Sequence, residues 1–249
     1  MTGLACRIQD ALRHQAPRGR DTERIGPFLA TFTREIDNPY LNYAIPDEGG
    51  SASPADVGAL VAAYRARDRK PRLEYIPSTA PEIEPVLLDA GFEIEGRLPL
   101  MTCVEAHVAI PGGIELVPPQ SEEEFLGAAQ VQWEAYGEPE PLPQRAIDGL
   151  RRTADNGGVV VLARDSKTGE PAGGGLCVAP HDGVTELTSI GVRKAFRRRG
   201  IAAAMAGWLA QAALDRGLSV FLMAMGADKA RIYSRAGFVE HGEVLHISV

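Results

Sequence analysis

Residues 192–205 read VRKAFRRRGIAAAM, a stretch in which five basic side chains within seven residues are followed by a glycine and an alanine-rich run. The chain of 249 residues carries a formal net charge of −7, so this concentration of positive charge is a local feature. A strand over residues 186–192 is predicted to lead into the basic segment, and a helix is predicted to begin at Gly200. The basic residues are therefore expected to surround the N-terminus of a helix.

A helix N-terminus of this kind has the properties of an anion-binding site. Its first backbone N–H groups have no partner inside the helix, and the helix dipole adds partial positive charge. Gly200 and Ala202 carry no bulky side chain that would hold a phosphate away, while Arg197, Arg198 and Arg199 supply charge-assisted donors. The stretch contains neither GxxxxGK[ST] nor GxGxxG, which disfavours a nucleoside triphosphatase and a dinucleotide dehydrogenase. The sequence thus predicts a pyrophosphate-binding loop.

The flanking sequence predicts an α/β fold of α+β type, with a mixed, mostly antiparallel sheet flanked by helices. Strands that form hairpins come first, and a strand–helix–strand crossover follows. The predicted elements are a strand at 114–117, helices at 121–136 and 143–155, strands at 158–164, 172–180 and 184–192, a helix at 200–216, a strand at 218–225, a helix at 228–236 and a final strand pair to Val249.

The loop Arg197-Arg198-Arg199-Gly200-Ile201-Ala202 resembles the [RQ]-x-x-G-x-[GA] acyl-CoA signature of the GNAT N-acyltransferase superfamily. Downstream, ARIYSRAGF at 230–238 resembles the Y-x-x-x-G-F element of that family, with Tyr233 in register. The order of predicted strands and helices over 114–249 is also similar. The resemblance implies the acyl-CoA N-acyltransferase fold and an enzyme that moves an acyl group, usually acetyl, from acetyl-CoA to an amine of a small molecule or peptide.

The resemblance also assigns roles to particular residues. The pantetheine arm of acyl-CoA is expected to pair with the backbone of Ile190, Gly191 and Val192, and the phosphates with the loop from Arg197 to Ala202. Glu186 is the candidate general base, with a solvent-facing strand carboxylate as the alternative interpretation. Tyr233 is the candidate acid for the departing thiolate and a further cofactor contact; the alternative is a core tyrosine packed under Phe238.

Three positions depart from the family pattern, and the acceptor site is less defined. Lys194 stands where many members have proline, and Gly226 stands where many have asparagine. Phe221 stands where some members have a catalytic glutamate, so the identity of the general base stays open. Trp133 and Tyr136 share one face of the helix at 121–136 and are expected to pack in the core, with acceptor binding as the alternative interpretation. In the following acidic loop, Glu138 and Glu140 are candidates to attract a cationic amine, or else plain surface residues.

Two stretches reveal an internal repeat: DAGFEIEGRLPL at 89–100 and RAGFVEHGEVLH at 235–246, displaced by 146 residues from Gly91 to Gly237. At this displacement, the basic loop falls on residues 51–54, SASP, and Tyr233 falls on Leu87. Residues 1–111 are therefore predicted to form a truncated, degenerate GNAT-like domain without an acyl-CoA site, which lacks the opening strand and two helices. Residues 112–249 are predicted to form the catalytic domain, in a layout that resembles tandem GNAT proteins.

Composition excludes several other classes of protein. The five histidines and three scattered cysteines predict no metal site and fit reduced thiols in a cytoplasm. The net negative charge argues against nucleic acid as the partner, and the apolar runs are too short for a membrane span. Two other functions stay open: a non-catalytic acyl-CoA sensor or regulatory module, and an O-acyltransferase. The acceptor, the acyl chain length and the oligomeric state are left open as well.

Overall fold

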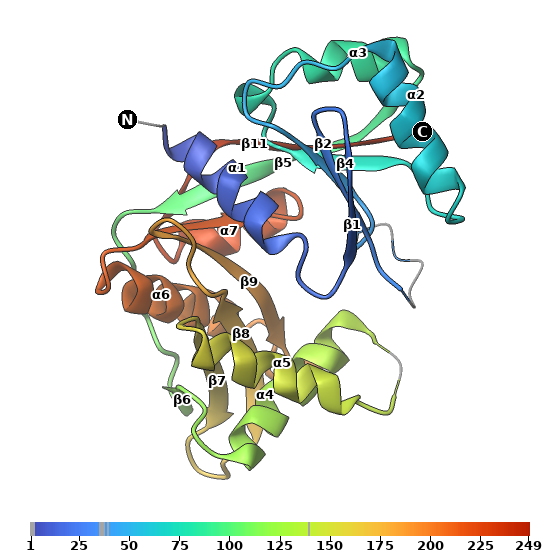
Figure 1. Ribbon diagram of the computed structural model, residues 1–249. Coiled ribbons are helices and arrows are strands. Elements are labelled where there is room, and N and C mark those ends of the chain that lie inside the picture. The colour runs from blue at the N-terminus through green and yellow to red at the C-terminus, as the bar shows by residue number, and fades with distance from the viewer. Residues whose placement is uncertain (1–2, 35–37, 39, 139) are drawn as a thin grey trace. The chain divides into compact units, whose positions relative to one another are not determined.

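The computed structural model describes residues 3–34, 38, 40–138 and 140–249, which form two compact units (Figure 1). Unit 1 comprises residues 1–100 and 242–249, and unit 2 comprises residues 101–241. The limits predicted from the sequence, 1–111 and 112–249, divide the chain by its repeat and not by its compact units. They remain a prediction.

Unit 2 contains the elements that the sequence predicts around the basic loop. They are β6 (Ile114–Val117), α4 (Glu122–Tyr136), α5 (Gln144–Asp155), β7 (Val159–Asp165), β8 (Pro171–Cys177), β9 (Val184–Val192), the 3-10 turn η2 (Lys194–Phe196), α6 (Ile201–Leu214), β10 (Ser219–Met223) and α7 (Ala227–Ser234). The predicted final strand pair is instead one strand, β11 (Phe238–Ser248). Gly242 does not interrupt it, because its backbone is not in the left-handed region.

The sheet of unit 2 is mixed and mostly antiparallel, as predicted. Its strand order is β6-β7-β8-β9-β10-β5, where β10 is parallel to β9 and the strands from β6 to β9 alternate in direction. Leu176 and Cys177 are neighbours on β8 but belong to different buried clusters, one with α4 and α5 and the other with α6. Since successive strand residues point to opposite faces, these helices cover opposite faces of the sheet.

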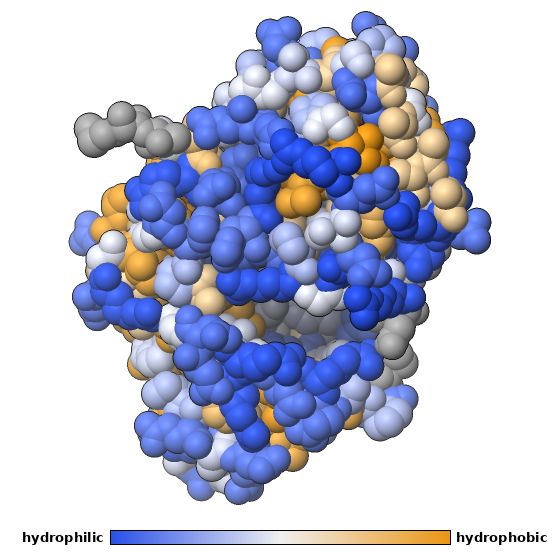
Figure 2. All heavy atoms as spheres, viewed as in Figure 1, coloured by the Kyte–Doolittle hydropathy of each residue, from blue (hydrophilic) through white to orange (hydrophobic). Residues whose placement is uncertain are grey.

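The helix pair α4 and α5 shows why each helix packs on the sheet. Phe125, Ile147 and Leu150 bury one apolar stripe in the core. The outward surface of this pair is mainly hydrophilic, as the lower part of Figure 2 shows. Ser121 caps the start of α4, where its side chain accepts from the Glu124 N–H at 3.2 Å.

Unit 1 is built from α1 (Leu4–Gln15), β1 (Asp21–Ile25), β2 (Phe28–Phe32), β3 (Ala44–Pro46), α2 (Pro54–Arg65), β4 (Arg72–Tyr75), the turn η1 (Pro77–Thr79), α3 (Ile83–Asp89) and β5 (Glu93–Cys103). Its strand order is β1-β2-β3-β4-β11-β5, with β3 and β4 parallel. One helix precedes β1 in the described residues, whereas two helices precede β7 in unit 2.

The two halves of the sequence share one order of elements at the displacement of 146. Adding 146 to the limits of α2, 54 and 65, gives 200 and 211, close to α6. The same shift takes β4 from 72–75 to 218–221, beside the observed limits of β10. The repeat predicted from sequence is therefore present in the structure.

Each unit also contains a strand segment from the other half of the sequence. The end of β5, residues 101–103, belongs to unit 2, where β5 neighbours β10. The end of β11 belongs to unit 1, where Leu245–Ser248 pair antiparallel with Arg72–Tyr75 of β4. Neither unit has its complete sheet without chain from the other half.

A network of charged side chains accompanies the β4–β11 pairing. The Arg72 side chain is fully buried, and its guanidinium donates to Glu74 at 2.9 Å and to Glu95 at 2.8 Å. Its third nitrogen lies 2.8 Å from Nδ1 of His246. Ser248 donates a further hydrogen bond of 2.6 Å to Glu95. The buried charge is thus compensated on several sides, as burial requires.

This network shifts two pKa values away from their ordinary range. Burial opposes ionisation of Glu95, but hydrogen bonds from Ser248, Arg72 and Lys70 outweigh it and lower the pKa of the carboxyl to about 2. Burial lowers the pKa of His246, and the charge of Arg72 lowers it further. The charges of Glu74 and Glu95 raise this pKa but do not outweigh the other two effects. The folded state therefore holds Glu95 ionised and His246 neutral.

We expect stability to fall as the pH falls, in two stages. Below about pH 6.5 the unfolded state binds a proton at His246 before the folded state does, and this favours unfolding. Between about pH 4.3 and about pH 2 the unfolded state likewise binds a proton at Glu95 that the folded state does not. Glu95→Gln should lower the free energy of unfolding at pH 7 by about 2 kcal/mol and should lose its effect near pH 2. Urea unfolding at pH 7, 4 and 2 measures this, with Glu93→Gln on the same strand as control.

Candidate active site

The strands β9 and β10 run together for a short distance and then separate. Their parallel pairing joins Val184 to Ser219, Thr185 to Val220 and Glu186 to Phe221. Within the described residues the pairing ends there, although β9 continues to Val192. The second part of β9 therefore has a neighbouring strand, β8, on one edge alone.

An extra residue in β9 accompanies this separation. Gly174 of β8 faces Gly191, but Leu176 faces Thr188, so β9 holds one more residue than β8 in this interval. Ser189 lies in this bulge with φ of 57°, in the left-handed region, and its carbonyl accepts a hydrogen bond of 3.0 Å from the Gln132 side chain. Since a bulge bends and twists its strand, it directs the end of β9 away from a straight course.

The edge of β9 beyond Glu186 has no neighbouring strand among the described residues, although its Val192 carbonyl accepts from the Arg197 side chain at 3.0 Å. The Arg193 N–H donates to the Ala172 carbonyl of β8 at 2.9 Å. Because backbone groups alternate between the two edges of a strand, the N–H of Val192 points to the opposite edge, where β10 no longer pairs. Ile190, Gly191 and Val192, the predicted pantetheine contacts, thus lie along an edge to which an extended ligand can add as a strand.

Glycines let the two helix layers approach the strands closely. A Cβ atom on Gly174 would lie 2.9 Å from the Ala128 carbonyl, and one on Gly191 would lie 2.9 Å from the Ala135 Cβ, both on α4. On the other face, a Cβ atom on Gly173 would lie 2.8 Å from the end of the Met205 side chain on α6. These distances leave no room for a side chain, so α4 is held directly against the bulged part of β9.

The basic loop connects the end of β9 to the N-terminus of α6. Phe196 is buried and holds the loop, while the side chain of Arg197 donates to the Val192 carbonyl at 3.0 Å. Arg198 has φ of 62°, and the guanidinium of Arg199 lies 5.3 Å from the centre of the Phe196 ring. All three arginines are exposed.

The N-terminus of α6 itself is open. Gly200 precedes the helix with φ of 85° and provides no side-chain cap, and among the described residues none beyond its chain neighbours lies within 4 Å of the place of its missing Cβ. The first-turn N–H groups of Ile201 and Ala202 therefore lack an intrahelical carbonyl partner. The predicted loop residues, from Arg197 to Ala202, meet at one exposed helix end.

The corresponding helix of the first half, α2, has a closed N-terminus. The Ser53 side chain accepts from the Asp56 N–H at 3.2 Å, and the Asp56 carboxylate accepts from the Ser53 N–H at 2.8 Å. Pro54 has no N–H to offer. A carboxylate of the protein already lies where an anion would bind.

Glu186 lies where β9 and β10 separate, because it is the last residue of β9 that pairs with β10. Its side chain is half-buried and near the thiol of Cys177: burial raises the pKa of that thiol to about 12, and the charge of Glu186 adds to the effect. Phe221, its partner on β10, is fully buried.

Tyr233 lies on α7 and is partly buried against the core of unit 2. Its ring meets that of Phe238 edge-on, with 6.2 Å between the ring centres. Burial raises the pKa of Tyr233 to about 12, and the phenol of Tyr136 adds to this shift. The Tyr233 hydroxyl therefore keeps its proton at neutral pH and lies in the neighbourhood of Tyr136.

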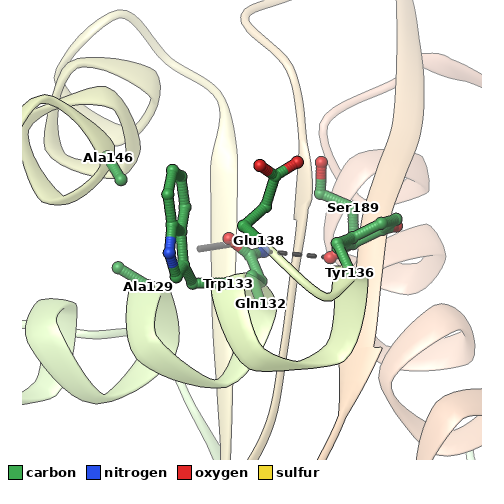
Figure 3. Close-up of a pocket in the computed structure, with 7 residues that line it drawn as sticks. All are labelled: Ala129, Gln132, Trp133, Tyr136, Glu138, Ala146 and Ser189. Carbon is green, nitrogen blue, oxygen red and sulfur yellow. Dashed lines mark hydrogen bonds between the residues drawn. The ribbon is translucent and has the colours of Figure 1, made fainter. Parts of the chain in front are cut away.

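A cavity of about 190 Å³ lies beside the bulge (Figure 3). One face of α4 provides four of its lining residues, Ala129, Gln132, Trp133 and Tyr136. The others are Glu138 after the helix, Ala146 of α5 and Ser189 of the bulge. The pocket thus opens on the same part of β9 that carries the open backbone edge.

The expectation that Trp133 and Tyr136 pack in the core is wrong. Both line the pocket, and Tyr136 is 60% exposed, because this face of α4 lies beside α5 and the bulge, beyond the buried core residue Ala129. Gln132 and Ser189 were not predicted. Gln132 shares its helix face with Tyr136, four residues later, which is a usable signal. The left-handed backbone of Ser189 has no sequence signal.

Comparison with known proteins agrees with this geometry. The Acetyltransferase (GNAT) family matches residues 123–238, from α4 to the start of β11. Residues 123–238 form a GNAT acetyltransferase domain. Acyl transfer is the general chemistry of this family, and acetyl-CoA is its usual co-substrate. A search of the curated proteins found no match.

Solved structures resemble the whole chain and not the GNAT domain alone. A GCN5-related N-acetyltransferase from Kribbella flavida is 26% identical over 100% of this chain and 96% of its own, with a TM-score of 0.79. A GCN5-related N-acetyltransferase from Sphaerobacter thermophilus is 16% identical, over 90% and 80%, with a TM-score of 0.65. A tandem GNAT protein from the clavulanic acid biosynthesis pathway is 12% identical, over 89% and 78%, with a TM-score of 0.62. The N-terminal half thus also resembles GNAT folds.

Metal-binding groups and membrane-spanning helices are both absent from the described part of the chain. It contains no group of three or more His, Cys, Asp or Glu side chains arranged to hold a metal ion. It also contains no helix that is both long and apolar enough to cross a membrane.

We expect Gly174→Ala to destabilise the GNAT domain by about 1–3 kcal/mol, because the added methyl group meets the Ala128 carbonyl and α4 must move outward. Urea unfolding of the variant measures this. Gly242→Ala is the matched control, since no other described residue beyond its chain neighbours lies within 4 Å of the added methyl group and its backbone suits alanine. Equal stability of the two variants would show that α4 does not lie so close to β8.

Proposed function

We propose that the protein transfers an acyl group, usually acetyl, from acyl-CoA to an amine, and that the GNAT domain alone carries the cofactor site. The observation that carries the proposal is the continuity between two features. The open edge of β9 leads through the basic loop to the uncapped N-terminus of α6. An extended pantetheine arm and an adjoining pyrophosphate require these two features in this order.

The chemistry of the loop supports this ligand. The space at Gly200 is open, so a phosphate can approach the first N–H groups of α6. Arg197, Arg198 and Arg199 would add charge-assisted hydrogen bonds, and the backbone of Ile190 to Val192 would pair with the pantetheine arm. The similar Kribbella flavida protein, named an N-acetyltransferase, points to the same reaction.

In the proposed reaction Glu186 accepts a proton from the amine, directly or through a water molecule. The amine nitrogen then bonds to the carbonyl carbon of the thioester, and the carbon–sulfur bond breaks with its electron pair on sulfur. The product is an amide and a thiolate. The nitrogen loses a second proton to water as the amide forms, and the thiolate takes up one proton from water while Tyr233 donates a hydrogen bond to its sulfur.

The raised pKa of Tyr233 defines what this residue can contribute. At a pKa of about 12 the hydroxyl is a hydrogen-bond donor throughout the working pH range. A thiol has a pKa of about 8.5, so complete transfer of the tyrosine proton to the thiolate is uphill. We therefore assign to Tyr233 stabilisation of the leaving sulfur by a hydrogen bond, and expect a modest contribution to the rate.

We expect one CoA per chain, and the combined change Arg199→Ala and Gly200→Glu should raise the dissociation constant at least tenfold. The glutamate places a bulky negative group at the helix N-terminus, and the lost charge-assisted bonds contribute about 1.5–3 kcal/mol each. Calorimetry with CoA measures both results, with Arg216→Ala as a control that removes one charge elsewhere in unit 2. Two equivalent sites, or an unchanged dissociation constant in the double variant, would contradict the assignment.

We expect Tyr233→Phe to lower kcat by about tenfold to a hundredfold and to leave CoA affinity nearly unchanged, because the ring still packs against Phe238 and the hydroxyl alone is lost. Acetyl-CoA consumption with a responsive amine gives kcat, and calorimetry gives the affinity. Tyr75→Phe is the matched control, since the buried Tyr75 hydroxyl has no hydrogen-bond partner among the residues that the structure describes. Equal turnover in Tyr233→Phe and the wild type would make Tyr233 a packing residue.

A further inference from the structure

We propose that the acceptor is a compact organic ammonium compound with an apolar body and no acidic group. The inference rests on the proposed function and concerns the pocket beside the bulge, which is lined by Trp133, Tyr136, Glu138 and their neighbours. The substrate class would then be simple amines, and amino acids with a free carboxylate would be excluded.

The walls of the pocket favour an apolar body. Trp133 and Tyr136 present aromatic surface from one face of α4, and the methyl groups of Ala129 and Ala146 complete the apolar part. Aromatic faces also attract organic cations, since the ring quadrupole is negative above the plane. At about 190 Å³ the cavity is smaller than the pockets of 300–1,000 Å³ that bind drug-sized ligands, so a compact body fits.

The charge of the pocket favours an ammonium group. Glu138 is the one charged side chain among the described lining residues, and no basic side chain lines the pocket there. A carboxylate on the acceptor would face Glu138 without any partner, at an energetic cost. The pocket therefore selects for positive charge and against negative charge.

Glu138 is held in this place by the end of α4. Gly137 ends the helix with φ of 72°, and the N–H of Glu138 donates to the Trp133 carbonyl at 3.1 Å. This is a common way for a helix to end, and it fixes the direction of the following residue. Glu138 and its neighbour in the loop, Glu140, are both exposed, but Glu140 does not line the pocket.

The arrangement also orients the acceptor. In Figure 3 the Glu138 side chain lies between Trp133 and Ser189. An apolar body against Trp133, Ala129 and Ala146 directs its ammonium group toward Glu138 and the bulge at Ser189. That end adjoins the start of the segment Ile190 to Val192, which is proposed to pair with the pantetheine arm.

Binding can be measured apart from turnover, because the chain has two tryptophans and one of them, Trp133, lines the pocket. In a Trp208→Phe protein, the fluorescence of Trp133 reports directly on occupancy. We would titrate this protein, with CoA present, with 2-phenylethylamine, phenylalanine and 3-phenylpropionate. We expect saturable binding of the amine, and binding at least tenfold weaker for the two compounds that carry a carboxylate.

Variants of the two loop glutamates test the role of charge. In the same background, Glu138→Gln should weaken binding of 2-phenylethylamine by about fivefold to tenfold, whereas Glu140→Gln should leave it within twofold. Glu138→Lys should reverse the order of the amine and 3-phenylpropionate. In turnover assays, Glu138→Gln should raise KM and leave kcat nearly unchanged, because it alters capture and not the chemical step.

Several results would overturn the proposal. They are a failure of 2-phenylethylamine to bind, binding of phenylalanine as tight as that of the amine, or equal effects of Glu138→Gln and Glu140→Gln. Each of them leaves the proposed acyl transfer intact if CoA binds at the α6 loop and another acceptor is acetylated. Conversely, absence of CoA binding would refute the proposed function, while the amine titration without CoA would still report on the pocket.

Discussion

The one extra residue in β9 is the constraint on which the candidate site depends. A parallel pair of strands normally continues to the end of the shorter strand, but here the pairing ends at Glu186 and Phe221. The bulge at Ser189 bends β9, and the Gln132 side chain holds the bulge by its carbonyl. The open backbone edge, the entrance to the basic loop and one wall of the pocket all lie beside this departure from regular pairing, which bends and twists the strand.

The two halves of the chain show how the same framework keeps or loses such a site. Each half contains a parallel pair of strands, β3 and β4 in the first half and β9 and β10 in the second. The helices α2 and α6, which belong to these pairs, correspond at the displacement of 146 residues. In the second half Gly200 leaves the helix N-terminus open, whereas in the first half Ser53 and Asp56 cap it with an oxygen and a negative charge. The framework is preserved in both, and the chemistry of a few residues at one helix end differs.

Much of this structure could be predicted from the sequence, because local patterns determine it. The capping box of Ser121 and Glu124 marks the start of α4, and the run of arginines before Gly200 marks the open end of α6. The bulge could not be predicted, since it arises from packing between β8, β9 and α4. The environment of Trp133 depends on α5 and the loop before it, and the course of β11 depends on its partner β4. Local sequence contains none of these tertiary contacts.

The most direct test of the central claim is hydrogen–deuterium exchange with and without CoA. If the open edge of β9 pairs with the pantetheine arm, the amides of Ile190 to Val192 and the first turn of α6 should exchange at least tenfold more slowly when CoA is bound. The corresponding segment of the first half, at β3 and the start of α2, should be unaffected. Protection in the first half, or unchanged exchange in β9 at saturating CoA, would contradict the assignment of the site to this edge.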